Sequence, residues 1–255
     1  MQPLRKHDGS TLQDAPTAFD VRDVVDVHSH QSMRGDYRVD CDARSKSQSM
    51  IGEWMKRAVD LVAASLGLLV LMPLFLLIAA LVRMTSPGPV FYRGPRTGRY
   101  GKPFRIFKFR SMVHDADRLG GTTTGKNDPR VTAVGSVLRK YKLDELPQLL
   151  NVVRGEMSLV GPRPEVAEYT DRYTEEERLI LTVRPGITDY SSLEFNDLQE
   201  AVGEGDPDEN FRRLVLPRKN ELRLKYVRER SFLGDLRILL RTVWVLASKP
   251  LRRTR

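Results

Sequence analysis

The chain has 255 residues, carries a formal net charge of +9 and contains one cysteine, Cys41. This length allows one sizeable domain with appendages, and a single cysteine excludes an intramolecular disulfide. The excess of basic residues indicates an anionic partner, without distinguishing nucleic acid, an acidic membrane surface and a phosphorylated substrate. The opening residues, MQPLRKHDGSTLQDAP, have no apolar stretch behind a basic start, so we expect no cleavable secretory signal.

Residues 1–50 have the composition of a flexible polar arm. They contain seven Lys/Arg and eight Asp/Glu, few large apolar residues and no sustained periodicity. Asp26, His28 and His30 have a spacing that metal ligands can use, but two histidines in such an arm lack the further fixed ligands that a metal site needs. We therefore favour a solvated segment over a metal site, with an inert thiol at Cys41.

The most apolar segment runs from Leu61 to Val82, which is 22 residues without a charge. A helix of this length can cross a bilayer, so residues 51–86 are predicted to form a membrane helix. Pro73 lies near its centre, where it removes a backbone hydrogen bond, and basic residues flank both ends. Because Lys and Arg favour the cytoplasmic side, these features suit a re-entrant helix that breaks at Pro73. A kinked helix that crosses the membrane is equally compatible with the residues alone.

Residues 87–255 are predicted to form a cytosolic domain that begins with strand-like segments. Phe91 to Met112 mixes aromatic and basic residues among glycine and proline turns. In an extended strand Lys108 and Arg110 would share one face, where they could line a phosphate site. Single-stranded nucleic acid also binds aromatic and basic surfaces, but this segment is short and rich in turns, so we expect no nucleic-acid partner.

Two adjacent carboxylates follow a predicted helix over residues 128–143. Asp144 occupies a position expected of a helix N-cap, and Pro147 falls in the first turn of the next helix. Simple capping explains such a pair in most chains. An anionic substrate held by Arg and Lys would instead allow Asp144 to attack phosphorus, with the helix dipole keeping it ionised. Glu145 could then hold Mg²⁺, which prefers oxygen ligands.

The remaining segments are turns and basic helices. Arg163 and Arg184 each lie in a proline-containing turn, and the second turn follows a short predicted helix. Residues 210–227 and 232–255 are helix-like, amphipathic and rich in Arg. Such helices lie in a membrane interface or pack on the domain core, and the two need not behave alike. The expected fold class is α/β, mostly helical with a small β element.

Three ordered motifs follow the proline-interrupted apolar segment: FYRGPRTGRYGKPFRIFKFRSM, LDELPQLLNVVRGEMSLVGPRPE and RPGIT. With these motifs the chain resembles the bacterial sugar-transferase family, the monotopic phosphoglycosyl transferases. The resemblance covers roughly Met55 to Tyr190 and continues more weakly through the final Arg-rich helix. The motifs are long and occur in a fixed order, so chance does not explain them.

The resemblance implies an activity and roles for the site residues. Members of the family transfer a sugar phosphate from a nucleotide sugar, usually a UDP-sugar, to undecaprenyl phosphate, releasing UMP and starting surface glycan or exopolysaccharide assembly. It implies that Asp144 is the nucleophile of a covalent phosphoglycosyl-aspartate and that Glu145 contacts Mg²⁺. The substrate-binding residues that it implies are basic: Lys108, Arg110 and Arg163 at phosphates, and Arg184 near the nucleotide or at the pocket rim.

The resemblance also implies a location, a monotopic protein on the cytoplasmic face of the bacterial inner membrane, with its apolar helix re-entering at a break like Pro73. After RPGIT the chain has DYSSLEF, where many relatives carry Gly followed by an aromatic residue and a Gln-Val pair, so the donor sugar is not predicted. The main alternative is a non-catalytic membrane-tethered scaffold that binds acidic lipids or a partner protein. It explains the charge but not the ordered motifs. A homo-oligomer is compatible with the sequence.

Overall fold

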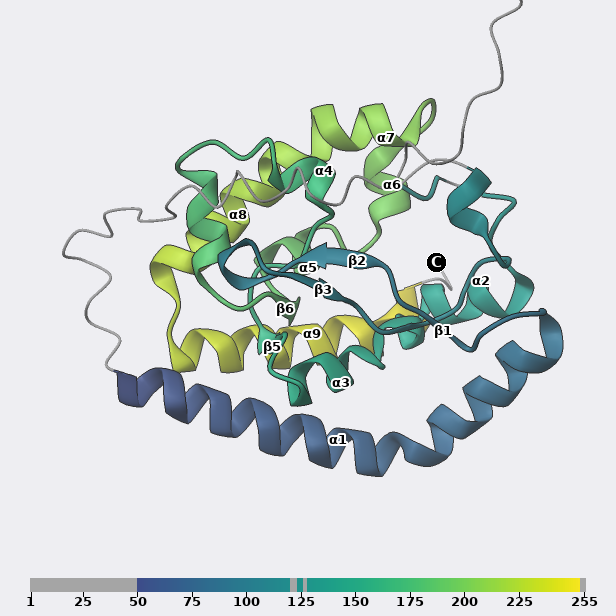
Figure 1. The fold of residues 1–255 in the computed structure, drawn as a ribbon, viewed down its shortest axis with the longest axis horizontal. Coiled ribbons are helices and arrows are strands. Elements are labelled where there is room, and N and C mark those ends of the chain that lie inside the picture. Colours follow the sequence, from purple (N-terminus) through teal and green to yellow (C-terminus); the bar gives the residue numbers. More distant parts are fainter. Residues whose placement is uncertain (1–49, 120–122, 126–127, 253–255) are drawn as a thin grey trace, which may run out of the picture. The chain divides into compact units, whose positions relative to one another are not determined.

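The structure is a computed structural model, and it describes residues 50–119, 123–125 and 128–252. All of them belong to one contact-defined unit, Asp42–Arg255. The predicted polar arm, residues 1–50, lies outside the described residues except for Met50, and so do the disfavoured metal ligands and Cys41 within it. The described part is mostly helical, with three small two-stranded sheets (Figure 1). This confirms the expected balance of helix and strand.

One long helix, α1 (Met50–Thr85), contains the whole apolar segment. Its 36 residues span about 54 Å at about 1.5 Å per residue, and it is the one helix of the described residues that is long and apolar enough to cross a membrane. Pro73 lies inside the helix without interrupting it, although the α1 ribbon in Figure 1 is bent. One proline removes a single hydrogen bond and bends a helix that its neighbouring turns maintain. The helix is thus confirmed, whereas a break at Pro73 is not seen.

The two faces of α1 differ in their surroundings. Ala64, Phe75, Ile78 and Val82 are buried against the domain, where α1 packs on α2 (Ala133–Lys140), α3 (Gln148–Val153) and neighbouring strands. The other face exposes large apolar side chains, namely Trp54, Met55, Val59, Val62, Leu66, Leu69, Val70, Met72, Leu76, Leu77, Leu81 and Met84. Since water does not favour such a face, α1 supports membrane association.

The region predicted to be strand-like does contain strands, and the structure shows that they form two antiparallel pairs. The pairs are β1 (Phe91–Tyr92) with β4 (Lys108–Phe109), and β2 (Pro95–Thr97) with β3 (Pro103–Arg105), with η4 (Arg99–Gly101) between β2 and β3. The fully buried Asn151 of α3 accepts a hydrogen bond from Phe107 N at 2.9 Å and donates one to Arg105 O at 2.9 Å. These bonds fix α3 against the segment that carries Lys108.

A third pair, β5 (Ser158–Val160) with β6 (Gly186–Thr188), is parallel. Gly161 and Gly186 lie where the two backbones touch. A Cβ on Gly161 would lie 2.5 Å from the carbonyl oxygen of Arg184, and one on Gly186 would collide with the backbone nitrogen of Gly161. Glycine is therefore required at this contact because it lets the two backbones approach each other.

The predicted helix over residues 128–143 is shorter than expected, since α2 begins after its N-cap Thr132, whose side chain accepts a hydrogen bond from Gly135 N at 2.9 Å. The other short helices are η5 (Ala116–Leu119), η6 (Leu143–Glu145), α4 (Ala167–Thr170), η7 (Glu177–Thr182), α5 (Tyr190–Glu194), α6 (Leu198–Val202), α7 (Pro207–Asn210) and the π-helical η8 (Phe211–Val215).

The last two helices take different roles. In α8 (Leu216–Glu229) the side chains of Leu222, Leu224 and Tyr226 are buried in the domain. In α9 (Phe232–Arg252) large apolar side chains are exposed instead, namely Phe232, Leu233, Leu236, Leu240, Val243 and Trp244. Thus α8 packs on the core, and α9 has the apolar outer face expected of a membrane-interface helix.

Candidate active site

Three of the predicted site residues meet in one ion-pair cluster, here called the Glu145 cluster (Lys108, Glu145 and Arg163). Glu145 Oε1 accepts a hydrogen bond from Lys108 Nζ at 3.0 Å and forms an ion pair with Arg163 Nη2. Lys108 comes from β4, Glu145 from η6 and Arg163 from the turn after β5, so three separate elements converge. The side chains of Lys108 and Arg163 are 21% exposed and that of Glu145 is 14% exposed. The cluster is therefore largely buried but still reachable by a ligand.

Arg163 is held in place by further contacts. Its backbone N–H donates to Asp189 Oδ2 at 3.1 Å, and its Nη1 donates to the carbonyl of Ile187 at 3.1 Å. Asp189 is fully buried and caps α5 by accepting from Ser192 N at 2.7 Å. The guanidinium is thus oriented by the β5–β6 pair before any substrate binds, which suits a bidentate phosphate contact.

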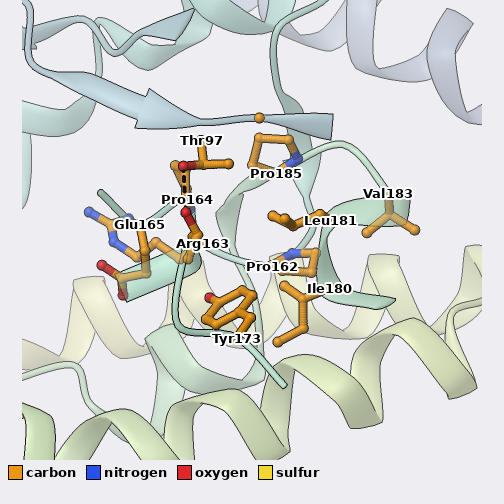
Figure 2. Close-up of a pocket in the computed structure, with 12 residues that line it drawn as sticks. Thr97, Pro162, Arg163, Pro164, Glu165, Tyr173, Ile180, Leu181, Val183 and Pro185 are labelled. Atoms are coloured by element: carbon orange, nitrogen blue, oxygen red, sulfur yellow. Dashed lines mark hydrogen bonds between the residues drawn. The ribbon is translucent and has the colours of Figure 1, made fainter. Parts of the chain in front are cut away.

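Figure 2 shows the packing around this turn. Pro162, Arg163, Tyr173 and Ile180 line a narrow cavity, and Thr97 Oγ1, also at its wall, is hydrogen bonded to Thr170 Oγ1 at 2.7 Å. The cavity measures about 10 Å³, room for no more than about one water molecule. The residues around it therefore pack against the turn, and the cavity is too small for a substrate.

Asp144 lies beside this cluster in η6 and is 5% exposed. Its Oδ1 atom is buried and has no hydrogen-bond partner among the described residues. A buried carboxylate oxygen without a partner costs free energy, so such a group indicates a binding or catalytic position.

The environment pushes the pKa values of the two carboxyl groups apart. Burial, followed by the charge of Glu145, raises the pKa of Asp144 against the opposing effect of Lys108 and other cations. Burial would also raise the pKa of Glu145, but Arg163 and Lys108 outweigh it and hold that pKa well below its usual range. The surroundings therefore favour the charged form of Glu145, whereas burial and the charge of Glu145 disfavour the charged form of Asp144.

The prediction that Asp144 caps a helix is wrong. The η6 turn has Lys142 at its N-cap, with φ 59°, and α3 has Pro147 at its N-cap, with no side-chain capping bond in either case. The short 3-10 turn separates Asp144 from the first N–H groups of α3, so the helix dipole does not keep Asp144 ionised. Lys108, Arg139 and Lys142 are the groups that favour its charged form.

Gln148, close to Asp144 in the sequence, was missed by the sequence analysis. It is fully buried, and neither its Oε1 nor its Nε2 has a hydrogen-bond partner among the described residues. It stands four positions after Asp144 in the DELPQ motif. A polar residue directly behind the proline of that motif was the available signal.

Arg110 does not join the Glu145 cluster. The strand β4 ends at Phe109, so the alternation that would place Arg110 beside Lys108 does not continue. Its Nη2 donates to Ser86 O at 2.7 Å and to Ser86 Oγ at 2.8 Å, while Nε and Nη1 have no partner among the described residues. Its role at a phosphate stays a prediction.

Arg184 also lies apart from the cluster. Its Nε donates to the carbonyl of Gly155 at 3.3 Å, and its side chain lines a cavity of about 280 Å³. The residues that line this cavity come from α1, η4, β5, the segment before β6 and the α8–α9 junction, and none of them belongs to the Glu145 cluster or is Asp144. Its predicted place near the nucleotide stays a prediction.

The donor atoms at this site suit a hard cation. Among the described residues no group of three or more His, Cys, Asp or Glu side chains could enclose a metal ion. Mg²⁺ needs no such cage, because it keeps water and binds substrate phosphates besides one or two carboxylates. The partnerless Oδ1 of Asp144 and the Oε2 of Glu145, which makes no hydrogen bond within the described residues, provide such oxygens.

Known proteins similar to this chain include a sugar-phosphate transferase and an exopolysaccharide production protein. The UDP-glucose:undecaprenyl-phosphate glucose-1-phosphate transferase of Escherichia coli (strain K12) is 42% identical over 200 residues, 77% of this chain and 41% of that protein. The exopolysaccharide production protein ExoY of Sinorhizobium fredii (strain NBRC 101917 / NGR234) is 39% identical over 208 residues, 76% of this chain and 85% of that protein. This chain thus spans less than half of the first relative and most of the second.

A third relative, the UDP-N-acetylgalactosamine-undecaprenyl-phosphate N-acetylgalactosaminephosphotransferase of Aeromonas hydrophila, is 40% identical over 148 residues, 57% of this chain and 35% of that protein. The family model described as bacterial sugar transferase matches residues 51–249, which include α1, the Glu145 cluster and most of α9. The resemblance carried by the three motifs is confirmed, and the chain belongs to the bacterial sugar transferase family and is a transferase.

Proposed function

We propose that this chain transfers a sugar 1-phosphate from a UDP-sugar to undecaprenyl phosphate and releases UMP. The relatives from E. coli and A. hydrophila support this proposal, since their names give these two substrate classes. Those names differ in the sugar, glucose in one and N-acetylgalactosamine in the other, so the donor sugar is left open. The ExoY relative supports a role in exopolysaccharide production.

The observation that carries the chemistry is the partnerless, buried Oδ1 of Asp144 beside a fixed pair of cations. In the proposed first step an Asp144 oxygen attacks the phosphorus next to the sugar, and the bond from that phosphorus to UMP breaks, with its electron pair leaving on UMP. An oxygen of undecaprenyl phosphate then attacks the same phosphorus and releases the Asp144 carboxylate. Two displacements of this kind replace one difficult transfer.

The Glu145 cluster would orient the phosphates in both steps. Arg163 and Lys108 carry the positive charge, and Glu145 keeps their side chains in place by binding both. Phosphate oxygens would bind the remaining N–H donors of these two side chains. Mg²⁺, when bound by Asp144 or Glu145 oxygens, would neutralise phosphate charge and orient the leaving group.

Incubation with donor alone tests the proposed nucleophile. Purified protein, Mg²⁺ and a panel of UDP-sugars without acceptor should release UMP in one burst and gain the mass of one sugar phosphate, located on Asp144 by peptide mapping. Adding undecaprenyl phosphate should remove that mass and restore turnover. UMP release that requires the acceptor, with no adduct at any time, would reject the covalent route while leaving the transferase assignment intact.

We also propose that α1 enters the membrane from the cytoplasm and returns to it, so that both of its ends lie on the cytoplasmic face. The bend in α1, its exposed apolar face and the apolar outer face of α9 support this arrangement. After Cys41→Ser, single cysteines at Ser49 and at the exposed Lys102 should both resist a membrane-impermeant thiol reagent in intact cells, and both should react in inside-out vesicles. Labelling of one position but not the other in intact cells would show a full crossing.

A further inference from the structure

The cavity of about 280 Å³ lined by Arg184 lies between the first turns of α1 and the α8–α9 junction, which Figure 1 shows near each other. Its wall contains five cationic side chains, Lys56, Arg57, Arg99, Arg184 and Arg230, and three carboxylates, Glu53, Asp60 and Asp235. The cavity therefore has an excess of positive charge.

The three carboxylates already have partners. Asp235 pairs with Lys56 and accepts from the hydroxyl of Tyr226 at 2.9 Å. Asp60 accepts from Ser158 Oγ at 2.7 Å and from Leu159 N at 3.2 Å.

The third carboxylate, Glu53, pairs with Arg99 at 3.4 Å and with Arg230 at 3.5 Å. None of the three forms an ion pair with Arg57 or Arg184 in the described part of the chain. Arg57 and Arg184 are therefore the two cations of the cavity wall that have no ion-pair partner in the described part of the chain.

Arg57 and Arg184 meet at the turn that ends α3. Arg57 donates to the carbonyls of Val152 at 2.7 Å and Val153 at 3.2 Å, and Arg184 donates to the carbonyl of Gly155 at 3.3 Å. These bonds cap the end of α3, and capping would be a sufficient reason for one arginine. Both guanidinium groups lie at Gly155 and repel each other, although the charge of Asp60 offsets part of this repulsion at Arg57. Each guanidinium also has more N–H donors than the three bonds use. An anion between them would relieve the repulsion and bind those donors.

The surroundings of the cavity identify the source of that anion. Met55 and Phe232 line it and are 60% and 57% exposed, and the neighbouring Trp54 and Leu233 are 73% and 74% exposed. Exposed apolar side chains at the start of both membrane-facing helices suit acyl chains, while arginine pairs suit a phosphodiester. A volume of about 280 Å³ is near the lower end for ligand pockets, of about 300 Å³, and would hold a head group but not a whole lipid.

We propose that this cavity binds the phosphate of an anionic phospholipid head group, such as that of phosphatidylglycerol, through Arg57 and Arg184. The site lies outside the Glu145 cluster, and the proposal assigns Arg184 to the lipid in place of the nucleotide role predicted for it. A bound head group would join α1 to the β5–β6 region and to the α8–α9 junction, because the cavity walls come from all three. The lipid would thereby set how the membrane helix sits on the domain.

The test measures which lipid the full-length protein retains. Protein released from nanodiscs with equal amounts of phosphatidylglycerol and phosphatidylcholine is analysed by native mass spectrometry. The wild type should retain phosphatidylglycerol preferentially. Arg184→Gln should lower that preference about tenfold, the worth of one charge-assisted hydrogen-bonding group. Arg184→Lys keeps the charge without the planar fork and should fall between the two.

Arg241→Gln is the matched control, because it removes an exposed charge of α9 outside the cavity. It should leave the preference within about twofold of the wild type, as expected of a single surface charge. An equal loss in Arg241→Gln and Arg184→Gln, or no loss in Arg184→Gln, overturns the proposal. If Arg184→Gln does not fold, as judged by thermal melting, Arg184→Lys decides alone, and an unchanged preference in it overturns the proposal.

A second arm separates a lipid head group from a soluble phosphate. Inorganic phosphate and glycerol 3-phosphate are added to the detergent-purified protein that holds phosphatidylglycerol. Retention of the lipid supports the proposed source, because the acyl chains contribute to its binding. Displacement by either soluble anion at equimolar concentration would instead show a site for free phosphate and overturn the assignment to lipid.

Discussion

Two buried clusters in this molecule contain the same kinds of residue. The Glu145 cluster joins a glutamate to a lysine and an arginine, and so does a second one, here called the Glu165 cluster (Glu165, Lys219 and Arg223). One member of each cluster lies on the same turn, where Arg163 and Glu165 flank Pro164.

The difference between the clusters lies in how closed they are. In the Glu165 cluster the side chains of Arg223, Lys219 and Glu165 are 0%, 8% and 13% exposed, and Asn220 accepts from Arg223 Nη1 at 3.0 Å. Among the fully buried side-chain nitrogen and oxygen atoms of that cluster, only Arg223 Nε lacks a partner within the part of the chain that the structure describes. The Glu145 cluster is more open and adjoins the partnerless Asp144 Oδ1. The composition of an ion-pair cluster therefore does not reveal its role, and the proposal of a catalytic role for the Glu145 cluster rests on its openness and on the partnerless Asp144 Oδ1.

The largest expected effect is that of Asp144→Asn. Turnover should fall about 10³-fold or more, because an amide cannot form the acyl phosphate. Thermal stability should stay equal or rise, since burial already disfavours the charge of Asp144 and an amide carries none. UMP release and the melting temperature in detergent provide the two measurements. Asp171→Asn, at an exposed position, is the control and should change neither. Substantial turnover in Asp144→Asn would contradict the proposed nucleophile, and the Glu145 cluster would then be a structural ion-pair cluster like the Glu165 cluster.

Matched substitutions of the two glutamates test the comparison directly. Glu165→Gln should lower the free energy of unfolding by about 3–5 kcal/mol, because it leaves two buried cations without their counter-ion. Glu145→Gln should cost less, since the side chains of Lys108 and Arg163 are each 21% exposed and Arg163 keeps its hydrogen bond to the carbonyl of Ile187. Its turnover should instead fall about 10²-fold as the phosphate-binding cations lose their orientation. The comparison fails if both variants lose stability equally and Glu145→Gln keeps its turnover.

Acid should weaken the Glu165 cluster in a defined pH range. Burial favours the neutral form of Glu165, but Lys219 and Arg223 outweigh it and hold its pKa at about 2, below the usual 4.5. A lowered folded-state pKa contributes stability that is complete above the unfolded pKa and is lost as the pH falls through the folded one. About 3 kcal/mol should therefore disappear between about pH 4.5 and pH 2. Melting temperatures across this range should fall less steeply in Glu165→Gln than in the wild type, and parallel curves would contradict this assignment.

The smallest effect expected is that of Gln148→Leu. Gln148 and Asn151 are both fully buried on α3, but Gln148 has no hydrogen-bond partner in the described region, whereas Asn151 bonds Phe107, Arg105 and Glu156. Gln148→Leu should leave the free energy of unfolding unchanged or raise it by about 1 kcal/mol, because no hydrogen bond is lost. Turnover should fall about tenfold if the Gln148 amide binds the substrate. Asn151→Leu should cost about 2–4 kcal/mol of stability. Equal destabilisation by the two changes would make Gln148 a structural residue.

Much of this fold follows from periodicity and composition. The uncharged run from Leu61 to Val82 predicts α1, and alternating aromatic and basic residues predict the strands before Lys108. The acid pair and Arg163 were also expected at one site. The residues alone did not predict the geometry of the short turn at Asp144. A 3-10 segment and Pro147 separate Asp144 from α3, so the prediction that Asp144 caps this helix was wrong.

Long-range packing decides the positions that sequence reasoning could not place. Arg110 contacts Ser86, at the end of α1, because β4 stops one residue earlier. Arg184 reaches the end of α3 because β6 pairs with β5 in parallel, a pairing that no local pattern specifies. Partnerless atoms such as those of Gln148 become visible only when the atoms around a side chain are known.

The contact between Gly161 and Gly186 has a consequence for how this chain can change. Gly161 stands in the GPRP motif and Gly186 in the RPGIT motif. The backbone at each glycine lies against the place where a Cβ on the other would be. A side chain at either position cannot be offset by shrinking the other, because glycine is already the smallest residue. A substitution at either glycine therefore disturbs both motifs. If this chain recombines with a relative, the sequence between the two motifs can be exchanged only when both glycines are retained.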